Sequence, residues 1–410
     1  MPTILQINTY DGGSTGSIAR NINTIAEQKG WKSYLYYGRD SYHKADVDNV
    51  RIMGRGVGYK MRVLSHVFTT RVFDRHGCGS YQDTKHLIAE IEQIKPDIIH
   101  LHNIHGYYLN YKILFKYLQE ANIPVVWTMH DCWPMTGHCV YFDYAKCNRW
   151  QECCYDCPQQ KTYPTSLIFD SSAKNYIKKK LTFSSVKKLV LVPVSNWLAG
   201  LVRNSFLKDK SVAVIHNGID VTVFNYCRNS SLVDQYNLAG KRIILGVASP
   251  WSRRKGLDDF YKLYLLLSKS QYQMVLIGLS SQQISKTPDG IIALQRTNSA
   301  EELSQWYSLA DVFVNMTYED NYPTTNLEAI SCGTPVITYR TGGSPESVTP
   351  QTGRVVEQGD LEGVVKAAEE LCAEDREAMR KRCREYALEH FDRNKNYEKY
   401  IELYELLLNH

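Results

Sequence analysis

The stretch that decides the fold of this chain, residues 319–346, reads EDNYPTTNLEAISCGTPVITYRTGGSPE. Its first proline, Pro323, suits the first turn of a helix, because a backbone N–H at that position would have no helical partner. Thr324, Thr325 and Asn326 follow, and the backbone N–H groups of a first helical turn are likewise unpaired. A helix start of this kind binds phosphate. The stretch therefore predicts a helix whose first turn, at these three residues, holds a phosphorylated ligand.

Carboxylates lie on both sides of this helix start. Glu319 and Asp320 enter the turn, and Glu328 follows Asp320 by eight positions, one or two turns into the helix. A carboxylate there can accept hydrogen bonds from both hydroxyls of a ribose while the helix start holds a diphosphate. Further on, CGTP ends the helix and VIT reads as the next buried parallel strand. The simpler alternative is a proline-started amphipathic helix with a carboxylate on its solvent face.

Taken whole, the stretch resembles the signature of the retaining, nucleotide-sugar-dependent glycosyltransferases of the bacterial group 1 family, glycosyltransferase family four. That signature has an acidic residue, seven residues, a Glu, and then a run through Cys-Gly-Thr-Pro-Val. Asp320 stands here where most members have Glu, and Glu319 beside it can share the role, so the assignment within the pair stays open. The resemblance implies the α/β fold named GT-B: two Rossmann-like domains facing across a cleft, with a C-terminal helix crossing back.

Strand and helix patterns alternate along the chain, which predicts parallel sheets covered by helices on both faces. The pattern restarts at 211–220, SVAVIHNGID, and the resemblance makes this segment the hinge between two domains. We expect residues 1–215 to form an N-terminal Rossmann-like acceptor domain with a cysteine-rich excursion at 132–160. Residues 216–386 would form a Rossmann-like nucleotide-sugar domain, and 387–410 a helix that returns to the first domain.

A basic turn in the second half, GVASPWSRRKGL at 246–257, follows a predicted strand and opens a predicted helix. Cations at a helix start oppose the helix dipole, so three in succession need an anion. Arg offers phosphate a fork of donors, and Lys offers a point charge. In the family an Arg and a Lys-Gly pair hold the donor diphosphate; Lys255 with Gly256 matches, and Arg253 or Arg254 supplies the arginine, with Arg254 preferred. The alternative is a basic helix start with solvated cations.

Two features of the first half complete the predicted site. Gly12 and Gly13 follow the first predicted strand, and glycines let a backbone approach a ligand closely; a tight turn is the alternative. His130 ends a later strand, where α/β sheets place ligands. The resemblance implies that the glycine loop faces the diphosphate and acceptor, and that His130 approaches the donor sugar. Three further histidines read as polar strand-end residues near the acceptor rather than as metal ligands: His100, His102 and His105.

Eleven cysteines are many for a protein of a reducing compartment, and six of them fall within the predicted excursion. Cys154 and Cys157 form a C-x-x-C pair, and Cys139 and Cys147 can complete four thiolates for a structural zinc ion. The segments between them predict little regular structure, which such a metal would stabilise. A reducing cytosol disfavours disulfides. The alternatives to this zinc site are therefore free thiols, or a zinc site in which Cys153 replaces Cys154.

Composition bounds the class of protein. A chain of 410 residues has room for two domains, and its 43% apolar and 22% charged residues are ordinary for globular proteins. No apolar run approaches the roughly 18 residues of a membrane-spanning helix. The first residues, MPTILQIN, lack the basic region of a signal peptide and read as a strand. We therefore expect a cytoplasmic protein, free or peripheral on the inner face of the membrane.

Charge is uneven between the halves. Residues 1–200 hold 24 Lys and Arg against 16 Asp and Glu, whereas residues 201–410 hold 24 against 27. Much of the excess lies in 51–76, where cations are interleaved with apolar side chains. A basic amphipathic segment can lie on an anionic membrane leaflet; a solvated surface helix, or a loop with a buried apolar stripe, is the alternative. We see no nucleic-acid-binding motif and expect no nucleic-acid partner.

The resemblance also implies the function: retaining hexosyl transfer, with no metal or cofactor in the chemistry, from a nucleotide sugar, with uridine the expected base, to a saccharide or lipid-linked saccharide acceptor. The expected pathway is assembly of a surface polysaccharide such as capsule or lipopolysaccharide. The residues expected in catalysis are His130, Asp320, Glu319, Arg254 and Lys255. Those expected to bind the donor are Gly12, Gly13, Arg253, Thr324, Thr325, Asn326 and Glu328. Three alternatives stay open: a nucleotide-sugar epimerase of the same fold, a non-catalytic module with a decayed site, and a basic membrane-surface or nucleic-acid binder.

Overall fold

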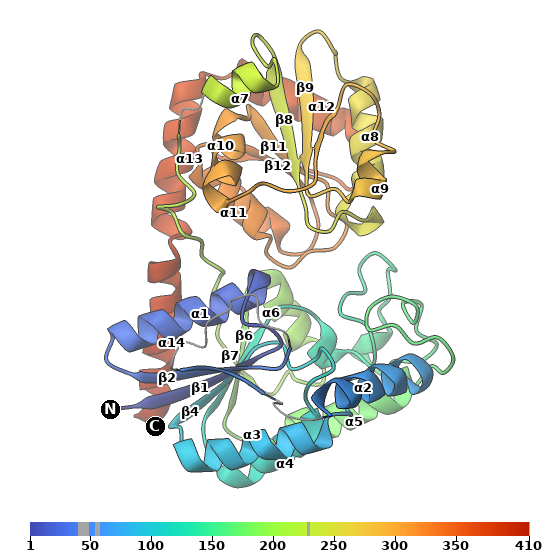
Figure 1. Cartoon of the computed structure of the whole chain (residues 1–410), viewed down its shortest axis with the longest axis vertical. Helices are drawn as coiled ribbons and strands as arrows, with labels where there is room; N and C mark the ends of the chain where they lie inside the picture. Colours follow the sequence, from blue (N-terminus) through green and yellow to red (C-terminus); the bar gives the residue numbers. More distant parts are fainter. Residues whose placement is uncertain (40–48, 54–57, 228–229, 410) are drawn as a thin grey trace. The chain divides into compact units, whose positions relative to one another are not determined.

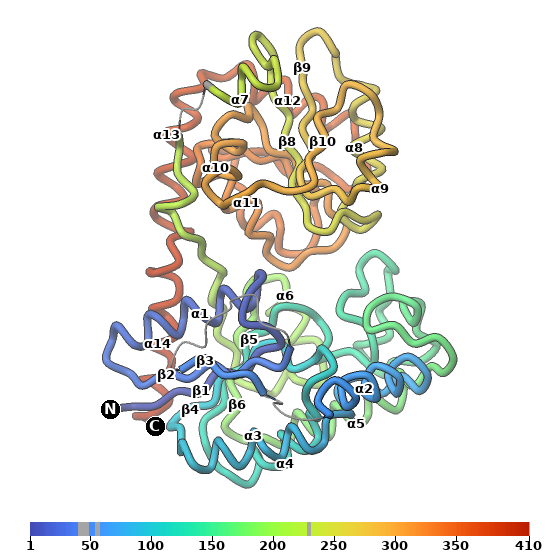
Figure 2. The backbone as a smooth tube through the Cα atoms, viewed as in Figure 1, coloured from blue at the N-terminus to red at the C-terminus, as the bar shows by residue number. Residues whose placement is uncertain are grey.

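The computed structural model describes residues 1–39, 49–53, 58–227 and 230–409. The chain divides into two compact units. Met1–His216 with Tyr397–His410 form unit 1, and Asn217–Asn396 form unit 2. Each unit is a parallel sheet with helices on its faces (Figure 1), and Figure 2 follows the backbone through each of them.

Unit 1 is built, in its described residues, on a seven-stranded parallel sheet of order β3-β2-β1-β4-β5-β6-β7. Its strands are β1 (Thr3–Asn8), β2 (Lys32–Tyr37), β3 (Val50–Ile52), β4 (Ile98–Leu101), β5 (Val125–Met129), β6 (Leu189–Pro193) and β7 (Ser211–Val212). Its helices are α1 (Gly13–Gln28), α2 (Tyr59–Phe73), α3 (Tyr81–Ile94), α4 (Tyr111–Ala121), α5 (Ser172–Ser184), α6 (Asn196–Arg203) and most of α14 (Arg393–Leu408). Every residue of β4, β5 and β6 is buried, because helices cover both faces of a parallel sheet.

Alternation of side chains along β1 separates two cores in unit 1. Ile4 packs in a cluster with apolar residues of α1 and α14. Leu5 and Ile7 face the other way and pack in a cluster with residues of α3, α4 and α5. The period of two along a strand therefore assigns one set of helices to each face of the sheet.

Unit 2 repeats this architecture with a six-stranded parallel sheet, over the residues described, of order β10-β9-β8-β11-β12-β13. Its strands are β8 (Arg242–Val247), β9 (Tyr272–Ile277), β10 (Ile292–Leu294), β11 (Val312–Asn315), β12 (Val336–Tyr339) and β13 (Gly353–Val356). Its helices are α7 (Ser230–Gln235), α8 (Leu257–Leu266), α9 (Ser281–Ile284), α10 (Ala300–Leu309), α11 (Thr324–Ser331), α12 (Leu361–Ala373) and α13 (Arg376–His390). Both units are thus doubly wound, as the alternating pattern predicts.

The strand orders fix where each unit can hold a ligand. In unit 1 the direction of winding reverses between β1 and β4, and in unit 2 it reverses between β8 and β11. Open parallel sheets bind ligands at the carboxyl ends of the strands beside such a reversal. The segments concerned begin at residues 9 and 102 in unit 1 and at residues 248 and 316 in unit 2. The fold therefore gathers the glycine loop with the histidines in one unit, and the basic turn with the acidic pair in the other.

The C-terminal division differs from the expected one. The sequence pattern predicts that the second domain ends at residue 386, whereas unit 2 extends to Asn396. The reason is that α13 buries Met379, Cys383 and Ala387 within unit 2, so the return to unit 1 begins only inside α14. Over the described residues, no helix combines the length and apolar content needed to cross a membrane.

Candidate functional site

The basic turn of unit 2 packs directly against the acidic pair. After β8 the chain forms a short 3-10 turn, Arg253–Lys255. The ammonium group of Lys255 forms an ion pair with the carboxylate of Asp320. Gly256 has a φ of +76°, and a Cβ there would lie 2.2 Å from the carbonyl oxygen of Met316. Glycine is therefore required where the two loops meet, which explains the Lys-Gly pair in structural terms as well as chemical ones.

The two arginines of the turn have different surroundings. Arg254 Nη1 donates to the carbonyl oxygen of Glu319 at 2.7 Å, and the Arg254 carbonyl accepts from the backbone N–H of Tyr318 at 2.8 Å. The side chain of Arg253 is 82% exposed, and its nearest charged partner, Asp258, lies 3.6 Å away. Arg254 is therefore the arginine held at the switch point, in line with the sequence preference. A donor contact by either residue stays a prediction.

The two members of the acidic pair, Glu319 and Asp320, make different kinds of contact. Glu319 is buried, and its carbonyl oxygen receives the Arg254 guanidinium. Asp320 places one carboxylate oxygen on Lys255, and the other accepts from the backbone N–H of Asn321 at 3.0 Å. Asp320 thus sets a negative charge beside the lysine expected to face a phosphate. Their roles toward a sugar stay predictions.

Helix α11 begins where the sequence predicts a helix start, and phosphate binding there stays a prediction. Pro323 precedes the helix, and no side chain that the structure describes caps its first turn. Thr324 and Thr325 are half-buried at this end of the helix. An uncapped first turn leaves backbone N–H groups whose natural partner is an anion.

Asn326, by contrast, is used within the fold. Its side chain is fully buried. Its Oδ1 accepts from Asn315 at 2.8 Å, and its Nδ2 lies 3.0 Å from the Ser344 hydroxyl and 3.1 Å from that of Ser347. These bonds fasten α11 to the turn at 344–347. A donor contact at Asn326 would therefore fall to the backbone.

Glu328 occupies a recess on α11. Its carboxylate accepts from the Tyr307 hydroxyl at 2.9 Å and from the hydroxyl of Thr324. Burial raises the pKa of Glu328 to about 6, although these two hydrogen bonds act in the opposite direction. At neutral pH the group is mostly ionised yet poorly solvated, which makes it a strong acceptor for paired hydroxyls.

The glycine loop of unit 1 begins α1. Gly12 is the N-cap in an extended conformation, and Gly13 has a φ of +67°. A Cβ on Gly16 would lie 2.6 Å from the backbone of Asp11. Asp11 itself pairs with Arg20 at 2.8 Å. Gly13 and Gly16 are therefore needed for the turn itself, whereas the extended backbone of Gly12 suits any residue. A part for Gly12 and Gly13 in donor binding stays a prediction.

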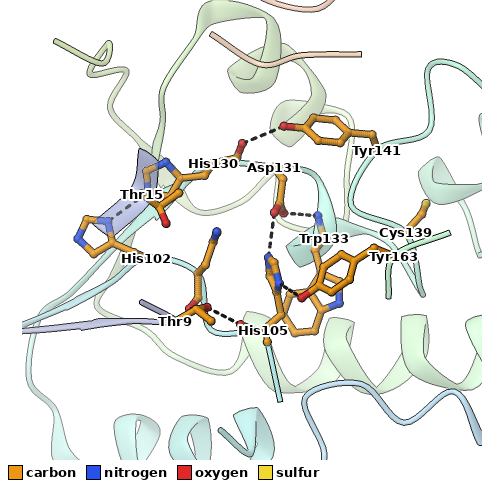
Figure 3. A network of polar contacts seen from close by, with 12 residues as sticks. Thr9, Thr15, His102, His105, His130, Asp131, Trp133, Cys139, Tyr141 and Tyr163 are labelled. Atoms are coloured by element: carbon orange, nitrogen blue, oxygen red, sulfur yellow. Dashed lines mark hydrogen bonds and ion pairs between the residues drawn. The ribbon is translucent and has the colours of Figure 1, made fainter. Parts of the chain in front are cut away.

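A hydrogen-bond relay leads to His130 at the end of β5 (Figure 3). His130 Nε2 lies 3.2 Å from His102 Nδ1, and His102 Nε2 lies 3.0 Å from Gln6 Oε1. Gln6 Nε2 donates to the carbonyl of Ala19, so Gln6 Oε1 must accept from His102. His102 is then protonated at Nε2, and its Nδ1 accepts the proton of His130 Nε2. The relay thereby leaves the lone pair of neutral His130 on Nδ1.

The electrostatics keep these imidazoles neutral. Burial lowers the pKa of His130 to about 4, although the charge of Asp131 opposes the shift. Burial also holds the pKa of His100 and His102 well below the ordinary value. Tyr404 of α14 contacts His100 Nδ1 at 2.7 Å. Unit 1 therefore offers uncharged hydrogen-bonding groups at its switch point.

Asp131 organises a second group of side chains beside the relay (Figure 3). Its carboxylate lies 2.9 Å from His105 Nε2 and accepts from the backbone N–H of Trp133 at 2.9 Å. The other ring nitrogen of His105 lies 3.1 Å from the Tyr163 hydroxyl. Burial opposes ionisation of Asp131, but His105 and the Trp133 N–H outweigh it and lower the pKa of Asp131. An ionised Asp131 thus fixes the position of His105.

Lys179 of α5 supports the loop that follows Asp131. Its ammonium nitrogen donates to the carbonyls of Trp133 and Thr136 at 2.7 and 3.0 Å and lies 3.5 Å from the centre of the Trp133 ring. The side chain is almost fully buried, which lowers the pKa of Lys179 to about 7. This lysine acts on the shape of the loop rather than on a ligand.

The cysteine-rich excursion has an apolar interior. Phe142 stacks on Trp150 with ring centres 4.8 Å apart, and Cys139 and Cys154 are buried in the same cluster. The Cys139 thiol contacts Cys157 and holds the pKa of Cys157 below its ordinary value. Among the residues that the structure describes, no three His, Cys, Asp or Glu side chains are grouped so as to hold a metal ion. Zinc at Cys139, Cys147, Cys154 and Cys157 stays a prediction without geometric support.

Several contacting residues escape sequence reasoning because their partners lie far away along the chain. Gln6 meets His102 across 96 positions, and Tyr163 meets His105 across 58. Tyr307 reaches Glu328 across 21. No local motif marks such residues; the only available signal is that polar side chains in buried strands and helices need partners.

Models of known protein families match both halves of this chain. The model described as "Glycosyl transferases group 1" matches residues 230–390, and the model described as "Glycosyltransferase Family 4" matches residues 26–223. The chain belongs to the group 1, family 4 glycosyltransferases. Both the signature at 319–346 and the basic turn lie within the first match. The relay histidines of the glycosyltransferase, His102 and His130, lie within the second match.

Relatives and solved structures agree with this assignment. WcaC of Escherichia coli K12, which bears the name of a colanic acid biosynthesis glycosyl transferase, is 24% identical over 371 residues, 87% of this chain and 88% of WcaC. Sucrose-phosphate synthase from Thermosynechococcus elongatus superposes with a TM-score of 0.72 at 17% identity, covering 100% of both chains. HepE of Anabaena in complex with UDP gives 0.68 at 13% identity, covering 98% of this chain and 99% of HepE. The fold is GT-B, with two Rossmann-like domains.

Proposed function

We propose that this glycosyltransferase moves a sugar from a uridine diphosphate sugar to a saccharide or lipid-linked saccharide acceptor in the assembly of a surface polysaccharide. The observation that carries the proposal is the basic turn held against the acidic pair, with Lys255 on Asp320, beside the uncapped start of α11. Two cations and a helix start form a receptor for a diphosphate. The name of WcaC, and that of CapM of Staphylococcus aureus as a capsular polysaccharide biosynthesis glycosyltransferase, support the pathway.

The proposed chemistry is substitution at the anomeric carbon with retention of configuration. The bond from that carbon to the diphosphate oxygen breaks, and a bond to the acceptor hydroxyl oxygen forms on the same face. The acceptor proton passes to the departing diphosphate. Negative charge grows on the diphosphate in the transition state, and Arg254, Lys255 and the N–H groups of α11 stabilise it. Because side chains and a helix supply this stabilisation, we propose that no divalent metal takes part.

The remaining predicted residues fit the rest of a donor. Glu328 would accept the two ribose hydroxyls, and Asp320 or Glu319 those of the sugar. His130, neutral and protonated at Nε2, would meet a sugar hydroxyl with its Nδ1 lone pair. The choice of uridine rests on the resemblance and on HepE, a protein of the same fold whose structure contains UDP.

Hydrolysis of a panel of nucleotide sugars tests this function. The protein is incubated without acceptor with UDP, GDP and ADP sugars, and released nucleotide and sugar are measured by chromatography. We expect slow release of UDP and free sugar from one or more UDP sugars. Conversion of a UDP sugar into its epimer without release of UDP would support an epimerase instead. No turnover of any donor, with no nucleotide binding, would support a non-catalytic module.

A further inference from the structure

Helix α2 of unit 1 buries polar side chains and exposes apolar ones. Its fully buried residues are polar, His66 and Thr70, whereas Leu64 and Phe68 have 60% and 61% of their surface exposed. The buried side is fixed by bonds to another segment: His66 Nδ1 lies 3.0 Å from the Ser80 hydroxyl, and His66 Nε2 accepts from the backbone N–H of Gly77 at 3.1 Å. Since these bonds determine which side faces inward, the apolar side cannot turn away from solvent.

A second segment extends this exposed apolar side. The backbone N–H groups of Leu167 and Phe169 donate to the carbonyls of Arg71 and Val72 at 2.7 and 3.1 Å. The Phe169 ring stacks on Phe73 with centres 5.8 Å apart and planes 7° apart. We call the resulting surface the apolar patch; its exposed members are Met61, Leu64, Phe68, Phe73, Leu167, Ile168 and Phe169. Exposed apolar side chains gathered from two adjoining segments indicate an interaction site.

Exposed cations lie on the same helix as the patch and on segments that follow it in the chain. They include Lys60, Arg71 and Arg75 from α2 and the residues after it, and Lys174 from α5. Arg75 lies 5.6 Å from the Phe73 ring. Lys60 and Arg71 therefore share α2 with Met61, Leu64 and Phe68.

The region around the patch contains two carboxylates, and both accept hydrogen bonds from neighbouring groups. In 58–75 and 161–188, ranges that the structure describes in full, the carboxylates are those of Asp74 and Asp170. Asp74 is buried, lies 2.6 Å from His138 and accepts from the Ser171 N–H. Asp170 accepts from the backbone N–H groups of Cys157 and Ser172. Asp170 is exposed and its pKa is lowered by these bonds, so the surface presents apolar groups with an excess of positive charge around one carboxylate.

We propose that the apolar patch docks this unit onto an anionic lipid bilayer, with the aromatic and aliphatic side chains entering the interface and the cations meeting lipid phosphates. Bilayers that carry anionic lipids match both features of the patch. A second copy of the chain does not, because two identical cationic rims would repel. The inference deepens the proposed function, since it places a lipid-linked acceptor at the same surface. Residues 54–57 of the predicted basic segment lie outside the described residues.

Vesicle flotation tests the proposal with the full chain. The protein is mixed with vesicles of phosphatidylcholine alone, or of phosphatidylcholine with phosphatidylglycerol, and the floating fraction is measured. We expect binding to the anionic vesicles at least about tenfold stronger than to the neutral ones. Raising the salt from about 0.1 M to about 1 M shortens the Debye length from about 10 Å to about 3 Å and should release most of the protein.

Two variants separate the apolar and charged contributions. Leu64→Ser with Phe68→Ser and Phe169→Ser should lose vesicle binding, and Lys60→Gln with Arg71→Gln and Arg75→Gln should bind neutral and anionic vesicles equally weakly. The matched control is Leu265→Ser with Leu266→Ser on α8, which replaces leucines that are 72% and 51% exposed in unit 2. The control should float like the parent protein.

The result that overturns the proposal is equal flotation of the parent and both patch variants, or no preference for anionic vesicles. Dimerisation that disappears in the apolar variant, seen by sedimentation, would identify a protein–protein surface instead. Hydrolysis of soluble donor is measured on the same preparations. Loss of vesicle binding with donor hydrolysis intact separates the docking surface from the chemistry, whereas absence of hydrolysis in every variant would count against the proposed function and leave the vesicle result independent.

Discussion

The switch point of unit 1 is lined by buried, neutral histidines, whereas that of unit 2 is lined by Arg254, Lys255 and two carboxylates. Both lie at the carboxyl ends of doubly wound parallel sheets. Burial suppresses the charge of the histidines in the first by lowering the pKa of His100 and His102, while Asp131 beside them stays ionised. In the second, paired charges remain, as between Lys255 and Asp320. One topology therefore supports two chemistries, and the side chains after the strands decide which.

Under the proposed function, this contrast would give the two units different tasks. The charged side chains of unit 2 can neutralise the negative charge of a diphosphate. That charge increases as the diphosphate leaves. Uncharged groups in unit 1 can orient hydroxyls without competing for that diphosphate. Substitutions in unit 2 should therefore change turnover and donor affinity strongly, whereas substitutions in unit 1 should have smaller effects through the orientation of hydroxyl groups.

The largest expected effect is on turnover in unit 2. Lys255→Ala should lower kcat by about two to three orders of magnitude, because the lysine stabilises charge that appears mainly in the transition state. Steady-state kinetics with saturating donor measure this. Lys262→Ala, which removes an exposed lysine of α8 paired with Asp259, is the matched control and should leave kcat unchanged. Parent-like turnover of Lys255→Ala would remove the lysine from the site.

A smaller effect is expected on donor affinity. Glu328→Gln should raise the Michaelis constant for donor at least tenfold, since a carboxylate bonded to ribose contributes roughly 1.5–3 kcal/mol. An unchanged constant would remove Glu328 from the ribose site.

Stability provides an independent check on Glu328. A folded-state pKa of about 6, above the ordinary 4.5, means that the folded protein binds its proton more tightly than the unfolded chain does. The free energy of unfolding contributed by this group therefore falls as pH rises from about 4.5 to about 6. Glu328→Gln should be at least as stable as the parent at pH 8 by thermal unfolding. A clear loss of stability would show that the carboxylate serves the fold rather than the ligand.

The pH dependence of donor binding should follow the same group. Donor affinity in the parent should weaken as pH falls through about 6, when Glu328 takes up a proton. Glu328→Gln should lose this dependence. His130, with a pKa of about 4, should not contribute above pH 5. An acid limb near pH 6 that persists in Glu328→Gln would assign the titration to another group.

The smallest expected effect lies in the unit 1 relay. Gln6→Leu removes the acceptor that fixes His102, so His102 and His130 should populate both neutral tautomers. Nitrogen chemical shifts of the imidazoles report this directly: one tautomer in the parent, and a mixture in the variant. We expect kcat to fall a few-fold with the donor Michaelis constant unchanged. Identical shifts in both proteins would refute the relay.

Sequence reasoning succeeded where the signal is local. Pro323 and the residues after it mark a helix start, and Lys255-Gly256 marks a loop, because each pattern is written within one turn of chain. The exposure of Leu64 and Phe68 was not predictable in this way, since an apolar stripe has the same period whether it faces a core or solvent. The boundary after Asn396 was missed because it falls inside α14, where neither proline nor glycine interrupts the sequence.

The contacts in unit 1 show the other limit. Glycine spacing and a histidine at a strand end indicate a site, but they do not reveal that Gln6 sets the tautomer of His130 through His102. Such partners are brought together by the order of strands in the sheet, which the sequence pattern leaves undetermined. The zinc prediction has the same weakness, because spacing between cysteines says little about an irregular segment.

Calorimetric titration of UDP tests the central claim, that unit 2 holds the nucleoside diphosphate, most directly. It compares the parent protein with Glu328→Gln and His130→Ala at pH 7.5. The account predicts that UDP binds the parent, that Glu328→Gln weakens binding at least tenfold by losing charge-assisted bonds to ribose, and that His130→Ala leaves UDP affinity unchanged. Unchanged UDP affinity in Glu328→Gln together with loss in His130→Ala, or no binding of UDP, GDP or ADP to the parent, would contradict it.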